Sequence, residues 1–195
     1  MIIIIDLGKE NTANIQQALD ELSIEYKVTS SEYEICRANC VILCGYGEAS
    51  AGLKKLHLMN LFTVMRIIKR PLLGIGLGMQ LMSTYSSEGN VSCLGIFPGS
   101  TEKFSAPAPD KRHTGMFPIH VQSESKILSG VRSDDKFYFD HSYYLPVAEN
   151  TTSVSEFGIN FSASMEKDKS FGVQFHPEKS GDAGLLILKN FLSIE

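Results

Sequence analysis

The sequence predicts an α/β protein with one domain over residues 1–195: an open, mostly parallel sheet flanked by helices, with added β structure in the middle. Short apolar runs that suit buried strands alternate with segments whose apolar residues recur at helical spacing. This alternation is typical of a parallel sheet covered by helices. A chain of 195 residues, 43% of them hydrophobic, is also long enough to bury one large core.

The first half of the chain carries the alternation. Met1 is followed by four isoleucines and an acid, which we interpret as a buried strand, because the run is too short for a signal or membrane segment and lacks a positive flank. The predicted elements are a strand at Ile2–Asp6, a helix opened by residues 11–15 and ending at Leu22, strands at Tyr26–Thr29 and Val41–Cys44, a helix at Leu53–Lys69, and a strand at Leu72–Ile75.

The middle of the chain differs in character from the first half. From Gly95 to Tyr144 it has shorter alternating runs, prolines and polar turns, which predict added β structure. Within it, the proline-containing stretch Ser105–Asp110 predicts a surface loop. A last helix is predicted at Gly184–Ser193, and we find no internal repeat or second domain.

The most informative motif is Pro71–Gln80, which reads PLLGIGLGMQ. An apolar run closed by alternating glycines and followed by helix-compatible residues is the layout of a nucleophile elbow, in which a strained turn projects one side chain above the sheet beside a helix N-terminus. Serine or cysteine normally occupies the apex, and here the apex is Gly76. Glycine tolerates the strained backbone but brings no attacking atom.

Two nucleotide-binding motifs compete for the same glycines. A dinucleotide-binding turn needs a third small residue where this chain has Met79, and an acid about 20 positions later that is missing here. A phosphate-binding P-loop ends in Gly-Lys-Ser/Thr, whereas Gly78 is followed by Met79. Neither motif fits, so an elbow or a simple glycine-rich packing turn remains.

A second motif, Phe171–Ser180, reads FGVQFHPEKS. An apolar alternating run leads into His176, and Glu178 follows two residues later, with Pro177 fixing the backbone so that both side chains point the same way out of a strand end. A base histidine oriented by a carboxylate is the second half of a nucleophile, base and orienter arrangement.

Composition excludes several classes of function. The net charge of −4 and the absence of a basic patch argue against a nucleic-acid partner, and we expect a cytoplasmic protein without a membrane segment. Three of the four cysteines, Cys36, Cys40 and Cys44, recur every fourth residue, which could suggest a metal site. The series runs into an apolar stretch, so reduced, mostly buried thiols and no metal are expected, with Cys93 as the fourth.

Over essentially its whole length the sequence resembles class I glutamine amidotransferases, and most of all the glutaminase subunit of imidazole glycerol phosphate synthase. That subunit carries an elbow of the form Gly-Ile-Cys-Leu-Gly-Met-Gln, a His-Ser/Thr-Tyr segment and a Phe-His-Pro-Glu-Lys-Ser segment. Here these segments are Gly74–Gln80, His141–Tyr143 and Phe175–Ser180, in the same order. The departure that matters most is Gly76 in place of cysteine.

The resemblance implies a catalytic role for each motif position. A cysteine at position 76 would attack the side-chain amide of glutamine, His176 would transfer the proton to departing ammonia, and Glu178 would hold His176 in the required tautomer. Backbone amides of Leu77 and, from the loop after the third strand, Tyr46 would stabilise the oxyanion. The family usually reads Pro-Gly-Val-Gly in that loop, where this chain reads CGYG.

The resemblance also implies residues that hold glutamine and no cofactor. Gln80 and Glu88 match positions that bind the substrate, the carboxylate of Glu88 suiting the ammonium group, while Ser142 and Tyr143 match contacts to its other end. Without the resemblance, Glu88 would be read as a solvated helix-end charge.

A partner subunit is implied as well. In the synthase family, ammonia passes into a (β/α)8 barrel subunit that forms imidazole glycerol phosphate, and this chain is too short to contain such a barrel. Two segments that depart from the family pattern, residues 6–11 and 113–117, fall where partner contact is expected. A subunit that supplies ammonia to a sugar amidotransferase for surface polysaccharide synthesis is therefore an alternative.

Gly76 has two interpretations. The chain is either an amidotransferase subunit that lost its nucleophile and with it the hydrolysis of glutamine, or a non-catalytic subunit that binds and regulates its barrel partner. The retained His176 and Glu178 favour the first interpretation, and the altered loop at Tyr46 favours the second.

Overall fold

The computed structural model describes residues 1–5, 7, 12–105 and 112–194. The elements of the first half are β1 (Ile2–Ile5), α1 (Ala13–Glu21), β2 (Tyr26–Thr29), α2 (Glu32–Cys36), β3 (Cys40–Gly45), α3 (Ala49–Leu58), α4 (Leu61–Ile67), β4 (Leu72–Gly76) and α5 (Leu77–Leu81). Those of the second half are β5 (Tyr85–Ser86), β6 (Val91–Ser92), β7 (Ser100–Lys103), β8 (His113–Pro118), β9 (His120–Val121), the 3-10 turn η2 (Lys126–Leu128), β10 (Lys136–His141), β11 (Tyr143–Tyr144), β12 (Thr151–Glu156), β13 (Asn160–Lys167), β14 (Ser170–Val173), the 3-10 turn η3 (Pro177–Lys179) and α6 (Gly181–Leu192).

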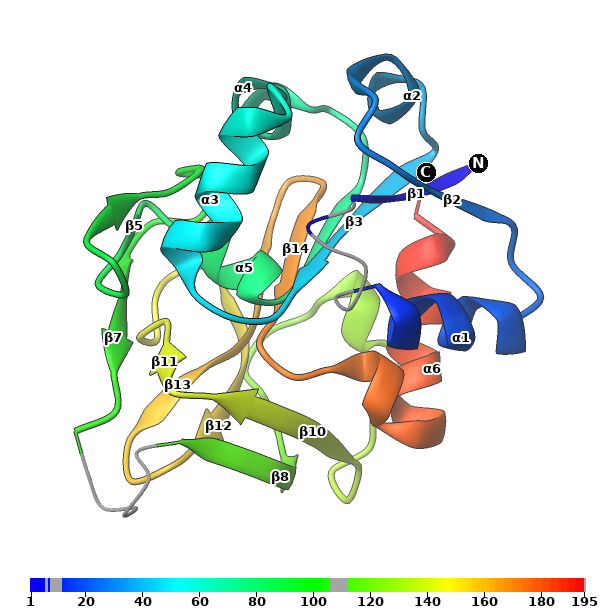
Figure 1. Cartoon of the computed structure of the whole chain (residues 1–195). Helices are drawn as coiled ribbons and strands as arrows, with labels where there is room; N and C mark the ends of the chain where they lie inside the picture. The colour runs from blue at the N-terminus through cyan, green and yellow to red at the C-terminus, as the bar shows by residue number, and fades with distance from the viewer. Residues whose placement is uncertain (6, 8–11, 106–111, 195) are drawn as a thin grey trace.

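The central sheet has eight strands in the order β2-β1-β3-β4-β14-β13-β12-β9. The strands from β2 to β14 pair in parallel, and β13, β12 and β9 extend the sheet with antiparallel pairing. The predicted fold class, a mostly parallel sheet flanked by helices, is confirmed (Figure 1). The carboxyl ends of β3 and β4 lie side by side near the middle of the sheet, where open α/β sheets bind ligands.

Each face of the parallel sheet packs against its own set of helices. In β3, Ile42 faces the core that includes α1 and α6, whereas its neighbours Val41 and Leu43 face the core that includes α3, α4 and α5. This alternation follows from the two-residue period of a strand. Figure 1 shows α1 and α6 together on one side of the sheet and α3 and α4 on the other. Burial on both faces explains why the strands read as continuous apolar runs.

The expected β structure in the middle of the chain is present. Strands β8 and β10 form an antiparallel pair, and β11, β7, β5 and β6 form a small separate sheet. These additions lie at the carboxyl end of the parallel strands and supply one wall of the pocket described below. The hairpin of β12 and β13, which widens the central sheet, had no counterpart among the expected elements.

Several boundaries differ from the sequence expectations. The expected helix at Leu53–Lys69 is two helices, α3 and α4, because Asn60 between them adopts a left-handed conformation with φ of 58° that interrupts the helix. The short helix α2 was not expected, and α6 begins three residues before Gly184. Residues 6, 8–11 and 106–110, which belong to the expected first strand, first helix, partner-contact segment and surface loop, lie outside the described residues.

The cysteines are free thiols, and three of the four are buried. Cys40 and Cys44 lie on the same face of β3, where they join the core that includes α1 and α6. Burial raises the pKa of the Cys40 thiol to about 12, so this thiol stays protonated at neutral pH. Cys36, at the end of α2, is exposed.

No helix within the described ranges is both long enough and apolar enough to cross a membrane.

Replacing Gly78 by alanine should destabilise the protein strongly. A Cβ atom at Gly78 would lie 1.7 Å from the carbonyl oxygen of Leu43, so β3 and α5 would have to separate. We expect a loss of about 3 kcal/mol or more in the free energy of unfolding, measured by urea denaturation. Gly52→Ala is the matched control, because its Cβ would meet only the flexible ends of side chains, Leu81 at 3.0 Å and Leu77 at 3.4 Å, and should cost far less. Equal losses for the two variants would contradict the close-packing argument.

Candidate functional site

The elbow predicted around Gly76 is present at the junction of β4 and α5. Gly76 has φ of 56° and ψ of −112°, a backbone conformation that residues other than glycine rarely adopt. It ends β4 and directly precedes the first residue of α5. In the parallel pairing, Gly45 at the end of β3 lies opposite Gly76, so the residues that follow them, Tyr46 and Leu77, leave the sheet beside each other.

His176 and Glu178 form a buried hydrogen-bonded pair beside the elbow. Nδ1 of His176 lies 2.9 Å from Oε1 of Glu178, and both side chains are 3% exposed. The pair is formed across the 3-10 turn η3, not at a strand end as expected. Ser180 fixes the backbone at this point by donating a 2.6 Å hydrogen bond to the carbonyl of His176, while its own oxygen accepts from the amide of Tyr138.

The charge on Glu178 determines the tautomer of His176. Burial alone would raise the pKa of Glu178, but the hydrogen bond and charge of His176, together with the hydroxyl of Tyr46, hold this pKa below its usual value. An ionised carboxylate only accepts hydrogen bonds, so Nδ1 of His176 must carry the proton that it shares with Glu178. In the neutral ring, Nε2 is therefore the nitrogen with a lone pair.

Gly76 lies against that nitrogen. A Cβ atom at Gly76 would be 3.1 Å from Nε2 and 2.9 Å from Cε1 of His176. A side chain at this position would therefore point at the imidazole, as a nucleophile must. The contact is also shorter than an ordinary Cβ contact, so a residue larger than glycine requires His176 to move by a few tenths of an ångström.

Tyr46 contacts the pair through its side chain, which the sequence did not lead us to expect. Its ring stacks on the ring of His176 at 4.6 Å and 5°, and its hydroxyl donates a 3.0 Å hydrogen bond to the same Glu178 oxygen that His176 uses. Lys179 lies 4.7 Å from the centroid of the Tyr46 ring. Tyr46 therefore clamps His176 and Glu178 in one geometry.

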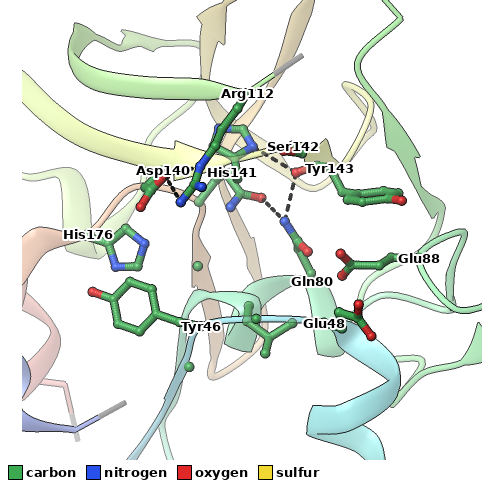
Figure 2. A pocket seen from close by; sticks show the side chains of 15 residues that line it. Tyr46, Glu48, Gln80, Glu88, Arg112, Asp140, His141, Ser142, Tyr143 and His176 are labelled. Atoms are coloured by element: carbon green, nitrogen blue, oxygen red, sulfur yellow. Dashed lines mark hydrogen bonds and ion pairs between the residues drawn. The ribbon is translucent and has the colours of Figure 1, made fainter. Parts of the chain in front are cut away.

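A pocket of about 260 Å³ opens over the elbow. It brings together eight of the nine predicted site residues, and Glu178 lies directly behind it, hydrogen-bonded to His176. The predicted residues in its lining are Tyr46, Gly76, Leu77, Gln80, Glu88, Ser142, Tyr143 and His176. Figure 2 shows that those it labels come from several elements and converge on one space.

One end of the pocket is rich in acceptors. Nε2 of Gln80 donates to the carbonyl of Tyr143 at 2.8 Å and to Gln174 at 3.0 Å, which leaves the amide oxygen of Gln80 on the side of Glu88 and Glu48 (Figure 2). The carboxylate of Glu88 accepts from the amide of Ala49 at 2.9 Å. Burial raises the pKa of Glu88, and the charge of Glu48 adds to this effect. Two neighbouring carboxylates and an amide oxygen suit an ammonium group.

The opposite wall contains an ion pair that the sequence reasoning missed. Nη2 of Arg112, the residue directly before β8, lies 2.6 Å from Oδ1 of Asp140 on β10, and both side chains line the pocket. Burial would raise the pKa of Asp140, but the hydrogen bond and charge of Arg112 lower it. The sequence offered one indication that Asp140 belongs to the site, because Asp140 directly precedes the His-Ser-Tyr segment. Nothing near Arg112 in the sequence indicates that it pairs with Asp140.

Two histidines are buried side by side at this wall: His141 lines the pocket, and His113 lies behind it. Nδ1 of His113 lies 3.1 Å from Nε2 of His141, and Nδ1 of His141 lies 2.8 Å from the carbonyl oxygen of Tyr143. Burial lowers the pKa of His113 to about 4 and that of His141 to about 3, so both rings are neutral at pH 7. His113 belongs to a segment where partner contact was expected, but it is buried within this chain.

A known protein family matches nearly the whole chain. Residues 3–194 match the family described as "Glutamine amidotransferase class-I". The chain belongs to the class I glutamine amidotransferase family.

Two relatives illustrate the likeness within the amidotransferase family. The chain is 39% identical to "Imidazole glycerol phosphate synthase subunit HisH 2" of Legionella pneumophila strain Paris, over 100% of this chain and 98% of that protein. It is 38% identical to the HisH subunit of Mannheimia succiniciproducens, over 98% of both chains. The expected resemblance to the glutaminase subunit of this synthase is thereby confirmed.

Solved structures in the amidotransferase family share the fold at lower sequence identity. A putative GMP synthase protein from Thermoplasma acidophilum superposes with a TM-score of 0.76 at 20% identity, covering 98% of this chain and 91% of that one. PurLQS from Thermotoga maritima gives a TM-score of 0.70 at 17% identity, covering 98% of this chain and 96% of the other. At these identities, the likeness supports the fold class alone.

The buried histidines predict how stability depends on pH. Unfolded histidines take up protons near pH 6.5, whereas folded His113 and His141 do so only near pH 4 and pH 3. The unfolded state therefore binds more protons than the folded state below pH 6.5. As the pH falls through this range, each histidine should lower the free energy of unfolding by up to about 1.4 kcal/mol per pH unit. Urea denaturation at pH 7.5, 6.5 and 5.5 measures this slope.

Two variants test the assignment of that slope. Removing one buried histidine, as in His113→Phe, should make the slope between pH 6.5 and pH 5.5 clearly shallower. The exposed His57 provides the control, since His57→Gln should leave the slope unchanged. A slope that is the same in all three proteins would exclude the buried histidines as its source.

Proposed function

We propose that this chain is the amidotransferase subunit of an imidazole glycerol phosphate synthase, that its pocket binds glutamine, and that Gly76 prevents it from hydrolysing glutamine. The synthase partner would be a separate (β/α)8 barrel subunit that uses ammonia to form imidazole glycerol phosphate in histidine biosynthesis. The names of relatives 38–39% identical over nearly the full chain support the pathway and the partner. The observation that carries the chemistry is the His176–Glu178 pair aimed at position 76.

The geometry of the pocket supports a specific pose for glutamine. Its ammonium group would lie between Glu88 and the amide oxygen of Gln80, with Glu48 adding negative charge. Its carboxylate would lie along Ser142 and Tyr143, and its side-chain amide would reach the elbow. Three polar contact regions within a volume of about 260 Å³ suit a ligand of amino-acid size.

With a cysteine at position 76, these groups would form a complete amidotransferase site. The thiolate would attack the amide carbon, His176 would take the thiol proton through Nε2 and give it to departing ammonia, and Glu178 would hold the Nδ1 proton. The backbone amides that follow the paired residues Gly45 and Gly76 would donate to the oxyanion. A water molecule would then attack the thioester, which breaks the bond between carbon and sulfur, releases glutamate and regenerates the thiol at position 76.

Without the thiol, the reaction loses its covalent step. Removal of a nucleophile from an intact triad costs on the order of a millionfold in turnover, and an unpositioned water does not replace it. The groups proposed to bind glutamine do not involve position 76, so affinity for glutamine should survive. The unaltered chain would then bind glutamine and leave it intact.

A second function, a non-catalytic subunit that regulates the barrel while free ammonia supplies nitrogen, is favoured by Tyr46. Its hydroxyl donates to the Glu178 oxygen that also orients His176. Its ring stacks on His176, whose Cε1 lies 2.9 Å from the place that the Cβ atom of a nucleophile would take. A site of this shape would suit a chain that works without a nucleophile at position 76.

Measurements on the unaltered chain, Gly76→Cys and Gly76→Cys/His176→Ala test the first proposal. Each is assayed for release of glutamate from glutamine, alone and with an imidazole glycerol phosphate synthase barrel. We expect no turnover in the unaltered chain, turnover in the cysteine variant that the barrel stimulates, and its loss without His176. Calorimetric titration of the unaltered chain with glutamine should show binding. If the unaltered chain turned over glutamine, and His176→Ala left this rate unchanged, the roles proposed for Gly76 and His176 would be refuted.

A double variant tests whether Tyr46 restricts the restored nucleophile. A cysteine at position 76 needs His176 to shift, and Tyr46 opposes that shift from the ring face and through Glu178. Gly76→Cys/Tyr46→Val, which restores the residue usual in the family, should therefore turn over glutamine faster than Gly76→Cys alone. Tyr46→Phe serves as the intermediate case because it keeps the stacked ring and removes only the hydroxyl. Equal rates in Gly76→Cys and in its combinations with Tyr46→Val and Tyr46→Phe would show that the Tyr46 side chain does not restrict the nucleophile.

A further inference from the structure

The two buried histidines have tautomers that the hydrogen bonds determine. The carbonyl oxygen of Tyr143 can only accept, so Nδ1 of His141 must donate to it, and Nε2 of neutral His141 then carries the lone pair. That nitrogen can only accept, so Nδ1 of His113 must donate to it. His113 is therefore a donor at Nδ1 with its lone pair on Nε2.

The lone pair of His113 is unmatched. Nε2 is buried and has no hydrogen-bond partner among the described residues. The ring lies within an aromatic group, 4.0 Å from the centroid of Phe117, 4.7 Å from Phe139 and 4.8 Å from Phe157. A buried acceptor without a partner destabilises a protein, and a phenylalanine at this position would leave one unpaired nitrogen as well, Nε2 of His141, so histidine satisfies no more buried acceptors than phenylalanine would. Stability of the core therefore does not explain a histidine here.

The hydrogen bonds lead from this core to the pocket. The carbonyl of Tyr143 accepts from His141 on one side and from Nε2 of Gln80 on the other, and Gln80 also donates to Gln174. Tyr143 and Gln80 both line the pocket (Figure 2). With both protons of its amide nitrogen directed to these acceptors, Gln80 presents its amide oxygen toward Glu88.

We propose that His113 is a positioning residue for the ligand pocket: through His141 it fixes the carbonyl of Tyr143, which in turn holds the amide of Gln80 with its oxygen toward the ligand's ammonium group. The proposal rests on the proposed function in one respect, that the ligand is an α-amino acid such as glutamine. His113 itself does not reach the pocket.

Removing the donor of His113 should weaken binding and spare the fold. In His113→Phe, the unpaired buried nitrogen becomes Nε2 of His141 instead of Nε2 of His113, so the number of unsatisfied atoms stays the same while apolar packing improves. His141 then loses the contact that fixes its ring. In His113→Asn, the side-chain NH₂ group takes the place of the Nδ1 donor, so the hydrogen bond to His141 is kept.

The experiment compares the full chain with these two variants at pH 7.5. Calorimetric titration with glutamine should give about fivefold weaker binding for His113→Phe, as expected for the loss of one hydrogen bond, and nearly unchanged binding for His113→Asn. The thermal midpoint of His113→Phe should equal or exceed that of the unaltered chain. Unchanged affinity in His113→Phe, or a loss in His113→Asn as large as in His113→Phe, would overturn the proposal.

A ligand-free measurement separates this proposal from the proposed function. Nitrogen-15 NMR should show a protonated Nδ1 and an unprotonated Nε2 for both histidines, and the side-chain NH₂ of Gln80 should exchange with solvent faster in His113→Phe than in the unaltered chain. If glutamine fails to bind the unaltered chain but this exchange rate responds, the proposed function is wrong and the positioning role stands. If the rate does not respond, or the tautomers differ, the positioning role is wrong whatever binds.

Discussion

The close approach of α5 to the sheet is the constraint on which the site depends. Gly78 comes so near the carbonyl of Leu43 that no Cβ atom fits, and this contact allows a helix to begin directly above the end of β4. Because the helix begins there, Gly76 turns sharply out of the sheet, Leu77 offers a helix-end amide, and Gln80 reaches the pocket from the next turn. The elbow is thus a property of backbone packing, and it persists with no side chain at its apex.

Around this elbow, the remaining groups are held by a continuous set of polar contacts. Glu178 accepts from both His176 and Tyr46, while the carbonyl of Tyr143 accepts from both His141 and Gln80. The Glu178 carboxylate therefore links the positions of His176 and Tyr46, and the Tyr143 carbonyl links those of His141 and Gln80. In a buried setting such shared acceptors restrict rotation, because any group that leaves its place gives up a partner that water cannot readily replace.

The sequence predicted the parts that depend on local pattern. The apolar runs and glycine spacing predicted the strand and the turn at Gly76, and the motif at His176 predicted that its side chain lies with that of Glu178. It did not predict the break at Asn60, since a left-handed residue leaves no periodic signal, or the role of the Tyr46 side chain, since stacking on His176 depends on the pairing of β3 with β4. The ion pair of Arg112 with Asp140 and the contact of His113 with His141 arise from the pairing of β8 with β10, whose register no short motif encodes.

The distribution of thiols makes the protein convenient to label. Cys36, the only exposed cysteine of the four, lies at the end of α2, shortly before the amino end of β3, whereas the pocket opens at the carboxyl end of that strand. A fluorophore or spin label attached there would lie toward the opposite edge of the sheet from the pocket, so it would leave the pocket unobstructed.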